Sequence, residues 1–452
     1  MAIRVLMVSA EPVGAQMAGP AIRALELARA LAASCQVTLA APAPSEVDDP
    51  RIELVQAGFE DFGPLREAIR GAQVVVAQQL PTRLLGQIAG TDVRLVADLY
   101  NTNTVEVLEY GRDQDRAGRR SLQRLVALRA IAHAGAADFI LCASERQRDL
   151  WLGTLAGSDL LSLADYDADP SLRRVIDVVP FGLPLEPPRP GPPAIKGVWP
   201  GIEAEDRVLL WGGGVWNWLD PFTAIDAARR LADARPPVHL LFLGMRRPGP
   251  EPGHATAAAA RARRVAGELG LAGRRVHFNE DWVPYRERGR WLLEADLGVS
   301  AHLDHLEARF SFRTRMLDYL WASLPVVCTG GDALGDLVER RGLGLTVAPG
   351  DGEGFAAACS ALLEDTERRE QVGRAAGQAA QELTWARVAE PLIGYCQRAP
   401  ELPRRARHRG KVTTATLAQY PDMLREAYGQ GGARRVADRL VRNLARRLGR
   451  DG

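Results

Sequence analysis

The sequence predicts an α/β protein made of two doubly wound, parallel-sheet halves that face each other across a cleft. Strand-like apolar runs alternate with helical runs along almost the whole chain, a pattern typical of βαβ units. A proline-rich segment divides this alternation into two parts of similar size. Glycines follow the first strand of each part, at the edge where doubly wound sheets bind ligands.

In the first half, short runs rich in aliphatic residues predict strands at 3–9, 36–41, 73–78, 94–99, 139–144 and 175–180. Apolar residues recur at helical spacing between these strands, most clearly over 21–33 and 121–134. We expect residues 1–183 to form the first domain.

Seven prolines lie between Phe181 and Gly201. Proline at this density predicts a stiff, extended connector over 184–204, not a packed element. Behind it the alternation restarts, with strands expected at 207–213, 238–244, 276–280, 297–302, 325–331 and 344–349. Residues 205–398 are therefore expected to form the second domain, and 399–452 a basic helical tail.

The composition excludes several classes of protein. The formal net charge of +1 gives no overall attraction to nucleic acid. Five widely spaced cysteines, none with metal-ligand spacing, predict buried thiols in a reducing compartment. The chain begins with a strand pattern rather than a signal peptide, and no run approaches the ~18 apolar residues of a membrane span. We expect a cytoplasmic protein.

The glycines at the strand ends are candidate contacts for a phosphate or a ring. Gly19 opens the first helix, where free backbone N–H groups and the helix dipole favour an anion. Gly212, Gly213 and Gly214 follow the first strand of the second half, and Trp216 lies close behind. These glycines allow close approach of a ligand on which a tryptophan stacks, or they form a turn whose tryptophans fill the domain interface.

The stretch from Phe310 to Asp332 adds charged residues at another strand end. Residues 311–314 are expected to be the first turn of a helix, with outward-pointing N–H groups. Arg313 and Arg315 suit a diphosphate because guanidinium pairs with phosphate in a fork. Asp318, inside the otherwise apolar helix, either reaches a ribose hydroxyl or forms a structural ion pair with one of these arginines.

Acidic residues also follow a strand of the first half. Asp98 and Glu106 are candidate catalytic groups facing the cleft, with Asn101 and Asn103 between them; the alternative for one of these residues is that it only caps the following helix. We find no Ser/His/Asp set and no cluster with the spacing of a metal site.

With these features the chain resembles the GT-B glycosyltransferases, specifically the retaining family 4 (group 1) type, over about residues 1–398. The strongest part of the resemblance is the block LDYLWASLPVVCTGG, supported by the triple glycine after the proline linker and by Gly19. The resemblance implies two Rossmann-like domains, with a nucleotide-sugar donor bound by the second domain and the acceptor by the first. No metal cofactor is expected.

The resemblance also implies particular donor contacts. Counting back from Pro325 places Asp318 at the family's second glutamate, which binds ribose, and Phe310 at its first, whose sugar contact is absent or moved to Glu307. The family's arginine and lysine after the glycine-rich strand are missing here. Arg313 and Arg315, or Arg246 and Arg247, are the candidates to replace them. The expected donor-binding residues are Gly19, Gly213, Gly214, Trp216, Phe310, Ser311, Phe312, Arg313, Arg315 and Asp318.

The resemblance implies a glycosyltransferase that acts on a glycan or lipid-linked acceptor, with retention, in surface polysaccharide or glycoconjugate assembly. The missing family residues leave a non-catalytic nucleotide-sugar-binding subunit as an alternative. A nucleotide-sugar epimerase of the same fold is a second alternative, which would show more acid/base groups at the cleft.

The basic excess lies in the tail, with 13 Lys+Arg against 5 Asp+Glu over residues 401–452. Over 433–448 a narrow apolar stripe runs along a helix pattern that is otherwise rich in arginine. Such a helix suits an anionic bilayer and makes peripheral attachment to the inner face of the membrane one reading. The other reading packs the stripe against the protein's own domain or leaves the tail disordered.

Overall fold

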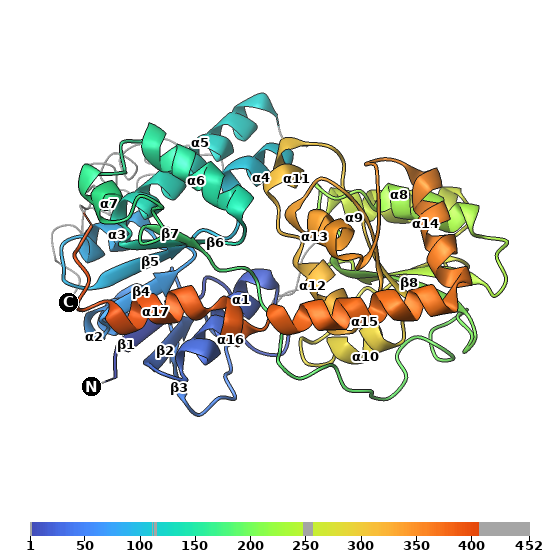
Figure 1. The fold of residues 1–452 in the computed structure, drawn as a ribbon, viewed down its shortest axis with the longest axis horizontal. Helices are drawn as coiled ribbons and strands as arrows, with labels where there is room; N and C mark the ends of the chain where they lie inside the picture. Colours follow the sequence, from blue (N-terminus) through green and yellow to red (C-terminus); the bar gives the residue numbers. More distant parts are fainter. Residues whose placement is uncertain (1, 111, 113–114, 247–255, 406–452) are drawn as a thin grey trace, which may run out of the picture.

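The computed structural model describes residues 2–110, 112, 115–246 and 256–405, which form two α/β domains side by side (Figure 1). In the first domain the sheet strands are β1 (Arg4–Val8), β2 (Gln36–Ala41), β3 (Ile52–Gln56), β4 (Val74–Ala77), β5 (Arg94–Asp98), β6 (Phe139–Cys142) and β7 (Ile176–Val178). In the second domain they are β8 (Arg207–Gly214), β9 (Val238–Gly244), β10 (Val276–Phe278), β11 (Leu297–Ser300), β12 (Val326–Thr329) and β13 (Gly344–Val347).

Both sheets are parallel, with strand order β3-β2-β1-β4-β5-β6-β7 in the first and β10-β9-β8-β11-β12-β13 in the second. In each sheet, successive strands are added on one side of the first strand, as far as β3 and β10, and then on its other side. The strand order therefore switches beside β1 and β8. A crevice opens at such a switch point, beyond the carboxyl ends of the strands. The predicted fold class of two doubly wound domains is confirmed.

The helices of the first domain are α1 (Gly19–Leu31), α2 (Gly63–Gly71), α3 (Thr82–Ile88), α4 (Asn103–Tyr110), α5 (Arg116–Ala136), α6 (Glu145–Gly157) and α7 (Leu163–Ala168). The remaining described helices are α8 (Pro221–Arg230), α9 (Ala257–Glu268), α10 (Arg288–Leu293), α11 (Leu306–Phe310), α12 (Thr314–Trp321), α13 (Ala333–Arg341), α14 (Gly352–Glu364), α15 (Thr366–Glu382), α16 (Trp385–Val388) and α17 (Glu390–Arg398). None of these helices combines the length and the apolar character that crossing a bilayer requires.

The proline-rich connector is more packed than the sequence predicts. Ala194 and Ile195 are buried, and the carboxylate of Glu294 accepts hydrogen bonds from the backbone N–H groups of Ala194, Ile195 and Lys196 at 2.6–2.9 Å. Prolines cannot donate hydrogen bonds, so the few remaining N–H groups of the segment take a charged acceptor from the second domain. The connector therefore lies along that domain.

The chain returns to the first domain after α15, which differs from the predicted boundary at residue 398. Figure 1 shows α15, α16 and α17 in a row across the two domains. Tyr395 of α17 stacks on Phe139 of β6 at a centroid distance of 4.6 Å, and Trp385 of α16 contacts Phe181 at 4.8 Å. Helices α16 and α17 thus complete the first domain. The predicted membrane helix at 433–448 lies outside the described residues.

Candidate functional site

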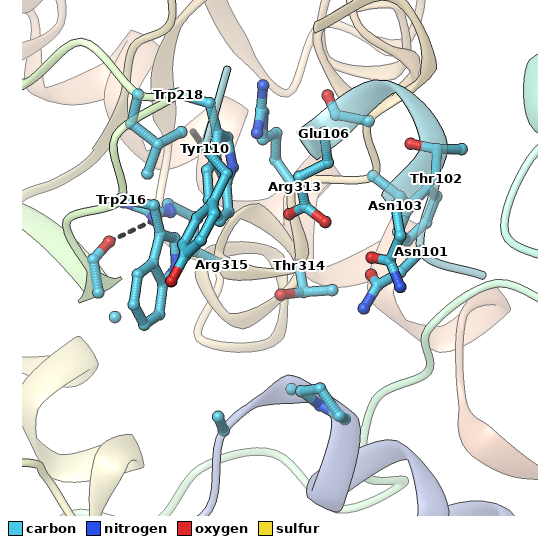
Figure 2. Close-up of a pocket in the computed structure, with 18 of the residues that line it drawn as sticks. Asn101, Thr102, Asn103, Glu106, Tyr110, Trp216, Trp218, Arg313, Thr314 and Arg315 are labelled. Atoms are coloured by element: carbon cyan, nitrogen blue, oxygen red, sulfur yellow. Dashed lines mark hydrogen bonds between the residues drawn. The ribbon is translucent and has the colours of Figure 1, made fainter. Parts of the chain in front are cut away.

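A cavity of about 850 Å³ lies between the domains, at the carboxyl ends of the strands in both sheets. Figure 2 shows the residues around it. The first domain contributes the start of α1 and the turn between β5 and α4, and the second contributes the glycine-rich end of β8 and residues 311–318. The cleft is where the sequence predicts it.

The three glycines at the end of β8 form one wall of the cavity. Gly213 has a φ of +76°, a conformation that favours glycine, and a side chain at Gly214 would meet the ring of Trp216 at 2.7 Å. Tyr319 of α12 holds this turn, since its Oη accepts from the Gly212 N–H at 2.7 Å and donates to the Val299 carbonyl at 2.9 Å. This part of the wall therefore consists of backbone without side chains, held in place by Tyr319.

Aromatic side chains group beside the glycines (Figure 2). Trp216 and Trp218 stack with ring centroids 5.9 Å apart, and Tyr110 of α4 contacts Trp218 across the cleft at 6.2 Å. The tryptophan rings line the cavity and also form a contact between the domains.

The sequence predicts that residues 311–314 are the first turn of a helix, but in the structure they separate two helices. The short helix α11 ends at Phe310, and α12 begins at Thr314 with Arg313 as its N-cap residue and no side chain capping it. Ser311, Phe312, Arg313 and Thr314 line the cavity. Phe310 does not. It lines a second cavity of about 520 Å³, and its carbonyl accepts a hydrogen bond from Gln147 of the first domain.

Arg315 is a cation without a carboxylate partner among the described residues. Its Nη2 donates to the carbonyl oxygen of Gly214 at 2.7 Å, and its guanidinium lies 4.7 Å from the ring of Trp211. Its Nη1 is buried and has no hydrogen-bond partner. Desolvation lowers the pKa of Arg315 to about 10, so the group remains charged near neutral pH. This arrangement favours an anion beside the glycine turn.

Arg313, in contrast, is paired within the protein. Its two terminal nitrogens donate to both oxygens of Glu307 at 2.6–3.0 Å, and its Nε lies 3.6 Å from Asp332. All three side chains are almost fully buried. The two arginines that sequence reasoning treated alike are therefore electrostatically different.

Glu106 faces this buried pair from α4 of the first domain (Figure 2). Burial, together with the negative charge of Glu307, raises its pKa to about 7. A carboxyl group with a pKa near neutrality can accept or donate a proton at working pH. Glu106 thus has the properties of the catalytic candidate that the sequence indicates.

Asp98 lacks those properties, and its prediction as a catalytic group is corrected by the structure. It is 3% exposed and does not line the cavity. Arg23 of α1 binds both of its oxygens at 2.7–2.8 Å and also donates to the carbonyls of Val179 and Pro180. The pair of Asp98 and Arg23 therefore fastens α1 to β5 and to the segment that follows β7.

Asp318 lines the cavity, but its partner is neither Arg313 nor Arg315. Arg288, at the start of α10, donates from Nε to its Oδ1 at 3.0 Å. Sequence reasoning missed Arg288, because it lies 30 residues earlier in the chain and no local spacing connects it to Asp318.

Gly19 forms the opposite wall of the cavity, where α1 begins with Pro20 in its first turn and no side-chain cap. The uncapped start of α1 therefore lies at the same cavity as Arg315. Within the described ranges, no group of three or more His, Cys, Asp or Glu side chains could hold a metal ion.

Residues 206–365 match the family model described as glycosyl transferases group 1. The chain is similar in structure to sucrose-phosphate synthase from Thermosynechococcus elongatus, with 18% identity, a TM-score of 0.61 and coverage of 88% of this chain and 98% of that one. HepE of Anabaena, solved with UDP-glucose, gives 16% identity, a TM-score of 0.61 and coverage of 88% and 100%.

WaaG, a glycosyltransferase involved in lipopolysaccharide biosynthesis, gives 16% identity, a TM-score of 0.56 and coverage of 87% and 99%. No curated protein matches the sequence significantly. The structural likenesses show that the fold is GT-B.

The chain has the GT-B fold, and its residues 206–365 match a glycosyltransferase family model, as the resemblance predicted. More particularly, its second domain is a group 1 glycosyltransferase domain.

Proposed function

We propose that the protein transfers a sugar from a nucleotide-sugar donor, bound in the cavity between the domains, to a glycan or lipid-linked acceptor. The observation that carries this proposal is Arg315, whose buried and unpaired Nη1 lies beside the glycine turn in a domain of glycosyltransferase type. The similar HepE was solved with UDP-glucose, which supports a donor of this class.

The donor diphosphate lies between Arg315 and the start of α1 in this proposal. Arg315 takes the role of the arginine and lysine that related enzymes carry after the glycine-rich strand. The open N–H groups near Gly19 add partial positive charge from the other domain. Asp318 accepts from the ribose, and Glu307 takes the sugar contact that Phe310 cannot make.

We propose retention of the anomeric configuration, with the leaving diphosphate assisting the incoming hydroxyl and with no metal cofactor. Glu106 is the catalytic group that remains after the correction of Asp98. It faces the buried pair of Glu307 and Arg313, where it can hold the acceptor hydroxyl by a hydrogen bond while the leaving diphosphate receives the proton.

The acceptor approaches from the first domain, and we propose that the protein works in the cytoplasm in surface polysaccharide or glycoconjugate assembly. Attachment of 433–448 to an anionic membrane would bring the site to a lipid-linked acceptor. The basic composition of that segment supports this part of the proposal.

Ligand-induced stabilisation tests the donor class. We expect UDP, GDP or ADP to raise the Tm, since a ligand at about 100 times its Kd stabilises the native state by about 2.7 kcal/mol. The matching nucleotide sugars should then be consumed, with the product anomer assigned by NMR. A protein that binds none of these nucleotides contradicts the proposal, and one that binds them without turnover of donor, alone or with acceptor, is the non-catalytic subunit.

A further inference from the structure

We propose that Arg288 is a positioning residue that sets how tightly the donor's ribose is recognised, acting through Asp318. The inference rests on the proposed nucleotide-sugar function. It concerns a residue that does not itself line the cavity.

Arg288 is held in one orientation by contacts on several sides. Its Nη1 donates to the Tyr285 carbonyl at 2.7 Å, and its Nε donates to Asp318 Oδ1 at 3.0 Å. Its guanidinium lies 3.9 Å from the ring centroid of Tyr285 and 4.5 Å from that of Trp321. A planar cation placed between rings and a fixed carbonyl has little rotational freedom left.

This orientation divides the two oxygens of Asp318 between two tasks. Oδ1 accepts from Arg288, whereas Oδ2 accepts no hydrogen bond from the described residues. The side chain of Asp318 is 35% exposed and lines the cavity, so Oδ2 is free to accept from a ligand. An aspartate is one methylene shorter than the glutamate expected at this position, so its direction matters more. Arg288 fixes that direction.

The segment just before Arg288 also contacts the other domain. Tyr285 donates from its backbone N–H to Ala15 at 2.8 Å, and Trp282 donates from Nε1 to Met17 at 3.1 Å. Both acceptors lie just before α1. Arg288 thus connects Asp318, the carboxylate proposed to bind the ribose, to this contact between the two domains.

The test compares a nucleoside diphosphate with its 2′,3′-dideoxy analogue, using whichever of UDP, GDP or ADP binds most tightly. The ratio of the two Kd values measures ribose recognition, and the Kd for inorganic pyrophosphate measures the diphosphate site separately. For the unmodified protein we expect a ratio of at least about tenfold, typical of a hydrogen bond to a charged group. Arg288→Gln should lower the ratio below about threefold and leave the pyrophosphate Kd within about twofold.

Two further variants separate positioning from general damage. Arg288→Lys keeps the charge without the planar fork and should give an intermediate ratio. Arg290→Gln is the matched control on the same helix, because its guanidinium pairs with Glu287 at 2.7 Å and does not line the cavity. It should keep the full ratio.

The double variant Arg288→Gln with Asp318→Asn should lose no more than Asp318→Asn alone, because the two residues act as one unit. A full ratio in folded Arg288→Gln and Arg288→Lys would overturn the inference while leaving the proposed function intact. Absence of nucleotide binding by the unmodified protein would overturn both.

Discussion

Arg315 and Gly214 are joined by a hydrogen bond of 2.7 Å from the guanidinium to the backbone carbonyl. The acceptor is neutral, so it orients the arginine without cancelling its charge. Two residues earlier, the charge of Arg313 is compensated by an ion pair with Glu307. The electrostatic difference between these neighbours leads to two opposite predictions.

Replacing Arg315 with methionine should remove donor affinity without loss of stability. We expect the affinity for a nucleoside diphosphate to fall about tenfold or more. The free energy of unfolding should stay unchanged or rise by up to about 2 kcal/mol, because the desolvation penalty disappears while the contact over Trp211 is lost. Calorimetric titration and urea unfolding measure the two quantities, and a variant that is strongly destabilised contradicts this account of Arg315.

Replacing Arg313 with methionine should destabilise the protein. The substitution leaves Glu307 and Asp332 buried without their cation, and breaking a buried pair in this way costs about 3–5 kcal/mol. Urea unfolding beside the Arg315 variant is the measurement. If the two variants have equal stability, the assignment of one paired and one unpaired arginine is wrong.

Replacing Glu106 with glutamine should stabilise the protein in a pH-dependent way. The raised pKa means that the folded state binds more protons than the unfolded state between pH 4.5 and about 7, so the protein loses stability as pH rises through this window. Glutamine does not titrate, so the variant should match the parent near pH 4.5 and exceed it by about 1–3 kcal/mol above pH 7. Unfolding at pH 5 and pH 8 gives the comparison, and a constant difference between the two pH values would show that Glu106 has an ordinary pKa.

Truncation after Arg405 should abolish binding to vesicles that contain anionic lipid and leave the fold intact. Residues up to 405 are kept because Arg404 pairs with Asp92 and Arg405 with Asp165 on the first domain. Each arginine near an anionic surface contributes about 1 kcal/mol, so binding of the full chain should weaken with salt. Co-sedimentation at low and high salt, with neutral vesicles as control, tests this. The membrane proposal fails if the full chain stays in the supernatant at low salt.

Local patterns predict most of the fold because buried parallel strands are continuous apolar runs. Strand β3 was missed because its sequence, IELVQ, mixes polar residues into a partly exposed strand that, among the described strands, pairs only with β2. The break between α11 and α12 was also missed, since no proline or glycine marks it.

Within the site, the sequence locates the groups that line the cavity but not their partners. Asp318 and Glu106 were found because each lies close behind a strand or inside a recognisable block. Their surroundings, Arg288 for one and Glu307 for the other, come from segments far away in the chain. Asp98 follows the same local rule and is nevertheless occupied by Arg23, a contact that only the packed helix α1 reveals.

The return of the chain to the first domain has a consequence for biosynthesis. A ribosome delivers residues 1–183 well before α17, so the face of Phe139 that Tyr395 covers remains open while the whole second domain is being made. Synthesis of the first domain begins before that of the second domain but ends after it, with α17. Nascent chains that stall within the second domain therefore leave this apolar face uncovered.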